Sequence, residues 1–190
     1  MKKYFLLLVL LSFFLNSCKP KTPISLAQKD RQLISYVNPF IGTGGHGHTY
    51  PGATRPFGMM QLSPDTRLDG WDGCSGYHYS DTEIFGFSHT HLSGTGVSDY
   101  GDILLMPTNK VVFNNGADGK EGYKSTFSHD KEVAEPGYYK VHLDDTNIDV
   151  ELTVTERSGI HKYQFAEGSK QIIILDLVYE SNPERLEVKQ

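Results

Sequence analysis

Alternation of apolar and polar residues dominates the second half of the chain. The clearest run covers residues 148–156, and residues 138–143 and 160–165 repeat the pattern less cleanly. A period of two places one face of a strand on a core and the other in water, so each run predicts a half-buried β-strand. An unbroken Ile-Ile-Ile-Leu run lies within residues 171–178 and predicts a strand buried on both faces.

The stretch before these strands is rich in glycine and histidine. Residues 38–101 hold 13 of the 19 glycines and five of the eight histidines, with only short apolar runs between turn signals. Short strands, many turns and almost no 3.6-residue period predict an all-β fold, an antiparallel β-sandwich over residues 36–190. A fresh alternation at Leu186 and Val188 stops at residue 190, so we expect the sandwich to be incomplete at its C-terminus.

The N-terminus has the pattern of an export signal. Two lysines precede an almost wholly apolar stretch at residues 4–15, which is too short to span a bilayer and predicts a signal peptide at residues 1–17. The residues that end at Cys18 resemble a bacterial lipoprotein box, so we expect Cys18 to carry a lipid anchor; ordinary cleavage near Ser17 is the alternative. Residues 18–35 then form a tether, and the protein is expected to be exported and lipid-anchored, at the periplasmic face or the cell surface.

Composition and charge limit the classes of function that this chain can have. The chain of 190 residues has 12% aromatic residues and a formal net charge of −5, which is typical of one globular domain. Without residues 1–17, 16 basic and 23 acidic side chains remain, a formal −7. No cluster of Lys and Arg is available to neutralise phosphates, so a nucleic-acid partner is not expected. Two cysteines are too few for a disulfide scaffold.

Two His-x-His pairs, at positions 46/48 and 89/91, are candidates for metal ligands. On a strand both imidazoles of a pair would point to one face, and further ligands would come from His78, Asp99 and Asp102. The alternative is that these histidines hydrogen-bond loops and line a polar cleft, with the two aspartates holding loops. A metal-binding protein built on the pairs is therefore one hypothesis.

The sequence gives little support for a dinucleotide-binding site or for a serine hydrolase. Gly42, Gly44 and Gly47 have the spacing of a dinucleotide-binding loop, but no helical pattern follows them, and that loop works by opening a helix. The chain contains no Gly-x-Ser-x-Gly motif of a serine hydrolase.

Trp71 is the only tryptophan and lies in a loop rich in Gly and Asp. Sugar sites combine a flat aromatic face with polar groups that bind hydroxyls. A lone tryptophan is often a core residue, so both a core position and a sugar platform remain open.

The motifs resemble one family when read in order. Five blocks, at residues 38–43, 50–58, 73–79, 86–96 and 99–107, are similar to the N-terminal domain of glycoside hydrolase family 92. The resemblance implies a β-sandwich of the galactose-mutarotase-like supersandwich type, packed on a larger (α/α)6 barrel, in calcium-dependent inverting exo-α-mannosidases that act on α-mannose-containing glycans. Val97 stands where many relatives have a cysteine, which removes a possible thiol partner of Cys74.

The resemblance also limits what this chain does. Inverting hydrolysis needs an acid and a base that flank the glycosidic bond. The family places these carboxylates and the calcium ligands in the barrel, so no residue here inherits a catalytic or metal role, and calcium is expected only for the full-length enzyme. The residues expected to contact sugar or shape the pocket are Trp71, Cys74, His78, His89 and His91, then His46, His48 and Arg55.

Three hypotheses follow for the function. The first is the carbohydrate-contacting, N-terminal portion of a secreted α-mannosidase, inactive alone. The second is a free-standing carbohydrate-binding lipoprotein. The third is a periplasmic metal-binding protein.

Overall fold

The computed structural model describes residues 33–67, 70–94, 96–97 and 99–179. The expected signal peptide, Cys18 and nearly all of the expected tether lie outside the described residues. The described residues from Ile34 to Tyr179 belong to one compact unit, and the description below concerns this unit. Within the described ranges, no helix has the length and apolar character needed to cross a membrane.

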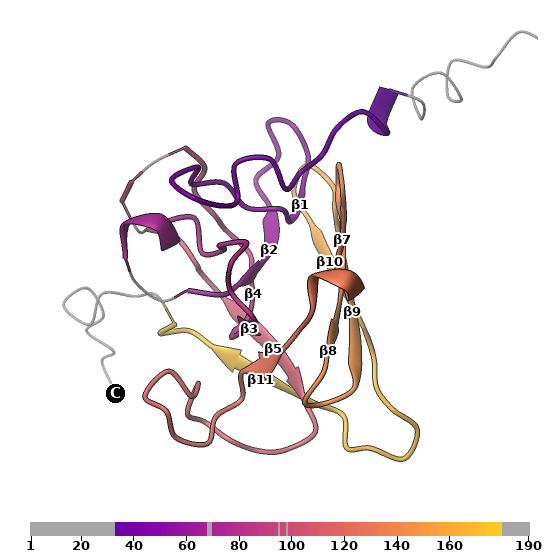
Figure 1. Cartoon of the computed structure of the whole chain (residues 1–190). Helices are drawn as coiled ribbons and strands as arrows, with labels where there is room; N and C mark the ends of the chain where they lie inside the picture. Colours follow the sequence, from indigo (N-terminus) through magenta and orange to yellow (C-terminus); the bar gives the residue numbers. More distant parts are fainter. Residues whose placement is uncertain (1–32, 68–69, 95, 98, 180–190) are drawn as a thin grey trace, which may run out of the picture. The chain divides into compact units, whose positions relative to one another are not determined.

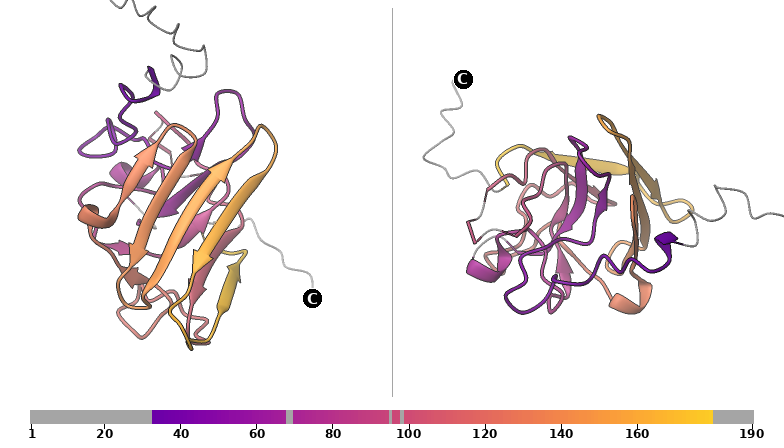
Figure 2. Two further views of the ribbon diagram at one scale, coloured as in Figure 1. Left: turned by 90° about the vertical axis from the view of Figure 1, so that its right-hand side faces the viewer. Right: turned by 90° about the horizontal axis from the view of Figure 1, so that it is seen from above.

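Two antiparallel sheets make up the unit (Figures 1 and 2). The five-stranded sheet has the order β1-β2-β4-β5-β11, and the four-stranded sheet has the order β10-β9-β8-β7. The strands of the first are β1 (Ala53–Thr54), β2 (Gln61–Asp65), β4 (Gly86–Ser88), β5 (Leu104–Thr108) and β11 (Ile172–Asp176). Those of the second are β7 (Val133–Glu135), β8 (Tyr138–Leu143), β9 (Ile148–Val154) and β10 (Gly159–Gln164).

Short elements connect these strands. A small ribbon pairs β3 (Glu83–Ile84) with β6 (Ser125–Thr126), and two 3-10 helices, η1 (Trp71–Gly73) and η2 (His129–Lys131), lie in the connections. The architecture confirms the expected all-β antiparallel sandwich.

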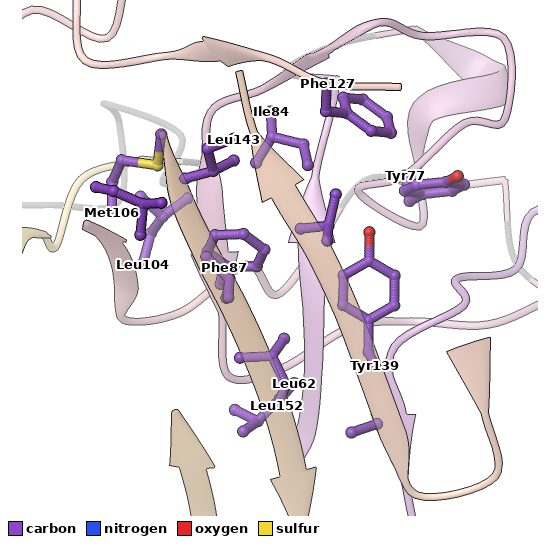
Figure 3. Close-up of a cluster of buried hydrophobic side chains, with 14 of the residues drawn as sticks. Leu62, Tyr77, Ile84, Phe87, Leu104, Met106, Phe127, Tyr139, Leu143 and Leu152 are labelled. Atoms are coloured by element: carbon purple, nitrogen blue, oxygen red, sulfur yellow. The ribbon is translucent and has the colours of Figure 1, made fainter. Parts of the chain in front are cut away.

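The core lies between the two sheets (Figure 3). The register of β8 and β9 places their apolar residues opposite each other, with Tyr139 opposite Leu152 and Val141 opposite Val150. The opposing sheet contributes further side chains that are fully buried, namely Leu62, Phe87, Leu104 and Met106. The alternation at residues 138–143 and 148–156 therefore predicted both the strands and their buried face.

Strand β11 differs from its prediction. Ile173 and Leu175 are 53% and 54% exposed, so the expected burial of this strand on both faces was wrong. One face of β11 stays exposed because β11 lies at the edge of its sheet and pairs with β5 on one side. Ile174 on the other face packs against the core.

We predict that Leu152→Ala lowers the free energy of unfolding by about 2 to 5 kcal/mol, because a fully buried side chain is lost and leaves a cavity. Ile160→Ala is the matched control, since Ile160 is 58% exposed in the same sheet. Urea unfolding of the two variants measures the difference, and equal losses would contradict the assigned core.

Candidate carbohydrate-contacting surface

Trp71 opens η1 and faces solvent. Gly70, with φ of 87°, precedes it in a conformation that favours glycine, and the tryptophan is 64% exposed. Its ring meets the His48 ring edge to face, with centroids 5.1 Å apart. A Cβ added to Gly96 would lie 2.2 Å from Cη2 of Trp71, so this glycine packs directly on the indole. The core position considered for Trp71 is thus excluded.

Asp72 joins the two histidines of the first His-x-His pair. Nδ1 of His46 lies 2.6 Å from Oδ1 of Asp72, and Nε2 of His48 lies 3.5 Å from the same oxygen. The His48 nitrogen is buried and has no aligned hydrogen bond, whereas the His46 side chain is 81% exposed. The hydrogen bond from His46 lowers the pKa of Asp72 below its ordinary value. We call His46, His48, Trp71 and Asp72 the Trp71 cluster.

The Trp71 cluster has the chemistry of a sugar-contacting surface. An exposed aromatic face lies beside a carboxylate that accepts hydrogen bonds and imidazoles that donate or accept them. The lowered pKa keeps Asp72 ionised at neutral pH, which suits binding rather than proton donation. An open depression of about 380 Å³ lies elsewhere, against β8 and β9, and shares no lining residue with the cluster.

His78 uses both ring nitrogens for hydrogen bonds to neighbouring loops. The residue is buried, its Nε2 donates to the carbonyl of Gly45 at 3.1 Å, and its Nδ1 accepts from the backbone N–H of Ser80. Arg67 reaches the same Nδ1 at 3.2 Å and also pairs with Asp81 at 2.9 Å. His78 therefore fixes the loop that carries His46.

His91 and Asp65 form a buried, hydrogen-bonded pair. Its Nε2 lies 3.0 Å from Oδ1 of Asp65, and both side chains are essentially inaccessible. Nδ1 donates to the carbonyl of Gln61 at 2.7 Å, and the hydroxyl of Ser88 lies 3.1 Å from Nε2. With both ring nitrogens engaged inside the protein, His91 supports the loops and does not reach a ligand at the surface.

His89 points away from His91 and meets a histidine of the other sheet. Its Nδ1 donates to the carbonyl of Ile103 at 2.5 Å, and its ring lies 4.9 Å from that of His161 in β10. Burial, and next the charge of His89, lower the pKa of His161 to about 4, so this ring is neutral at pH 7. The expectation that a His-x-His pair shares one face does not hold at 89/91.

The remaining candidates are dispersed. Arg55 is exposed in the β1–β2 connection, 3.7 Å from Glu156. Cys74 is buried directly after η1. Asp102 accepts from the hydroxyl of Thr90, and Asp99 accepts from the N–H of Tyr100, which agrees with loop-holding roles.

A calcium site does not fit the part of the chain that the structure describes. Calcium takes six to eight oxygen ligands. Among the described residues, no three His, Cys, Asp or Glu side chains come together to hold a metal ion.

The chain folds as an all-β sandwich and presents an exposed tryptophan beside polar loops. The profile of the glycosyl hydrolase family 92 N-terminal domain matches residues 36–190. The chain therefore belongs to glycosyl hydrolase family 92, as an N-terminal domain.

Solved structures and a curated relative agree with this assignment. A family 92 α-mannosidase from Bacteroides thetaiotaomicron, solved in complex with mannoimidazole, is 44% identical with a TM-score of 0.73 over 77% of this chain and 20% of its own. A family 92 inverting mannosidase from the same organism is 29% identical with a TM-score of 0.64, over 83% and 20%. An uncharacterized secreted glycosidase of Arthroderma benhamiae is 32% identical over 80% of this chain and 20% of its own. The chain thus spans about a fifth of the length of these relatives.

Two carboxylates escaped the sequence analysis. Asp72 lies in the Gly- and Asp-rich loop of Trp71 but was not singled out, and neither was Asp65. The available signal for Asp72 was its place between the lone tryptophan and a glycine. Asp65 ends a short strand and becomes recognisable only when β4 brings His91 against it.

We predict opposite outcomes for two histidine substitutions. His91→Ala leaves the fully buried Asp65 carboxyl without its imidazole partner, which costs about 3 to 5 kcal/mol of unfolding free energy. His46→Ala breaks a solvent-exposed pair and should cause a much smaller loss. Denaturant unfolding compares the two, and a small loss for His91→Ala would refute its structural role.

We also predict a pH dependence due to His161. Its pKa is about 4 in the fold and about 6.5 when unfolded, so the unfolded chain takes up a proton first as pH falls. The free energy of unfolding therefore falls by roughly 2 to 3 kcal/mol as the pH is lowered from 6.5 to 4.

His161→Phe removes this part of the pH dependence. Unfolding free energies at pH 7 and pH 4.5, measured with a chelator present, give the comparison. Equal pH slopes for wild type and variant would show that His161 titrates normally in the folded protein.

Proposed function

We propose that this chain is the carbohydrate-contacting, N-terminal portion of a secreted α-mannosidase that acts on mannose-containing glycans. The Trp71 cluster forms one wall of the sugar pocket, with Trp71 against a sugar ring and His46 and Asp72 near its hydroxyls. The exposed Trp71 beside the His46–Asp72 pair is the observation that carries the proposal.

The chain does not hydrolyse glycosides alone in this proposal. Inverting hydrolysis requires two carboxylates about 6.5 to 9.5 Å apart, one of them protonated. In the Trp71 cluster Asp72 is the single carboxylate, and its pKa is lowered, so it does not supply the acid. We propose that the acid and base come from the four-fifths of the relatives' length that this chain does not span, in an (α/α)6 barrel that also holds calcium.

Export and anchoring belong to the same proposal. The relative from Arthroderma benhamiae is described as secreted, which supports export. Residues 1–17 are proposed to direct it, with Cys18 lipidated and residues 18–35 serving as the tether.

The test is a chimera in which residues 36–179 replace the matching part of the 44% identical mannosidase. We expect the chimera to release mannose and the isolated chain to release none. Trp71→Ala in the chimera should lower kcat/KM about tenfold or more, because an aromatic contact of roughly 1.4 kcal/mol is lost.

Phe113→Ala is the matched control, since Phe113 is an 86% exposed aromatic residue in another loop. An active chimera with equal kcat/KM values for both variants would refute the assigned wall. Mannose binding by the isolated chain, abolished by Trp71→Ala, would favour the free-standing binding lipoprotein instead.

A further inference from the structure

His89 and His161 bring two imidazole rings together from different sheets. His89 directly follows β4, and His161 lies in β10. Their ring centroids are 4.9 Å apart with an angle of 38° between the planes. Their separation in sequence is 72 positions, so no spacing motif announces the pair.

Each ring is held through its Nδ1 atom. His89 donates from Nδ1 to the carbonyl of Ile103 at 2.5 Å, and Nδ1 of His161 lies 2.8 Å from the hydroxyl of Tyr163. Histidines that bind a metal through Nε2 are fixed in this way by a carbonyl or another partner at Nδ1.

The Nε2 atom of His161 is buried and has no hydrogen-bond partner. Buried polar atoms are almost always satisfied, so an unsatisfied one calls for a ligand or a water molecule. The carbonyl that orients His89 belongs to Ile103, a β-branched residue with φ of 58°. Such strained backbone concentrates at functional sites.

We propose that the Nε2 atoms of His89 and His161 together bind one transition-metal ion, Cu²⁺ or Zn²⁺. Imidazole nitrogens are suitable ligands for both ions. Metal–nitrogen bonds of about 2.0 to 2.1 Å place two such atoms about 3 to 4 Å apart, which the ring separation allows. Calcium is not the ion, because it takes oxygen ligands.

The site has two protein ligands, because no third His, Cys, Asp or Glu of the described ranges completes it. Water fills the other positions, as in sites with open coordination. The site is distinct from the His-x-His arrangement expected from sequence, since His91 is engaged by Asp65.

Cu²⁺ titration of the chain, followed by electron paramagnetic resonance, tests the proposal. The wild type should bind one equivalent more than His161→Phe, with coupling to two imidazole nitrogens that the variant lacks. His89→Gln is a second variant that leaves the more buried ring in place, and it should weaken the same equivalent at least tenfold.

His142→Gln is the control, because His142 is a partly exposed histidine of β8 that pairs with Asp149. It should leave both the stoichiometry and the nitrogen coupling unchanged. Near-ultraviolet circular dichroism verifies that each variant is folded. Identical stoichiometry and spectra for wild type, His161→Phe and His89→Gln would overturn the proposal and leave water between the rings.

Discussion

The buried pair of Asp65 and His91 is the contact on which the loops of this domain depend. Oδ2 of Asp65 accepts from the backbone N–H of Ser88 at 2.8 Å, and Oδ1 faces Nε2 of His91 at 3.0 Å. Gly76 passes so close that a Cβ there would lie 2.6 Å from Oδ1, and its φ of 78° also favours glycine. Because an unpaired polar group is costly to bury, the pair constrains β2, β4 and the loop after β2 together.

The Trp71 cluster depends on this arrangement. The backbone N–H of Thr66 donates to the carbonyl of Gly76, which closes the loop that carries η1 and Trp71. His78 in the same loop fastens Gly45 and so places His46 near Asp72. A rigid sandwich thus positions polar loops, which is where binding residues commonly lie.

Sequence predicted the strands best where one face is apolar and the other polar. β8 matches residues 138–143 because alternation reports directly which face is buried. The run in β11 is apolar on both faces, and its composition does not tell whether another layer covers Ile173 and Leu175. Burial by a neighbouring element is a tertiary property that a single strand does not encode.

The candidate site was predictable in part. The resemblance and the Gly-Asp neighbours of Trp71 pointed to the loop that carries η1, and Trp71, His46 and His48 do lie together. Sequence did not separate these histidines from His78 and His91, because hydrogen-bond partners such as Gly45 and Asp65 come from distant positions. The His-x-His argument assumed extended backbone, whereas His48 has φ of 53°.

The most direct test of the account is a crystal structure of the mannosidase chimera with mannoimidazole bound. The account predicts that the indole of Trp71 lies within about 4.5 Å of the sugar ring, with His46 or Asp72 near a hydroxyl. A bound sugar that contacts no residue of the Trp71 cluster would contradict it.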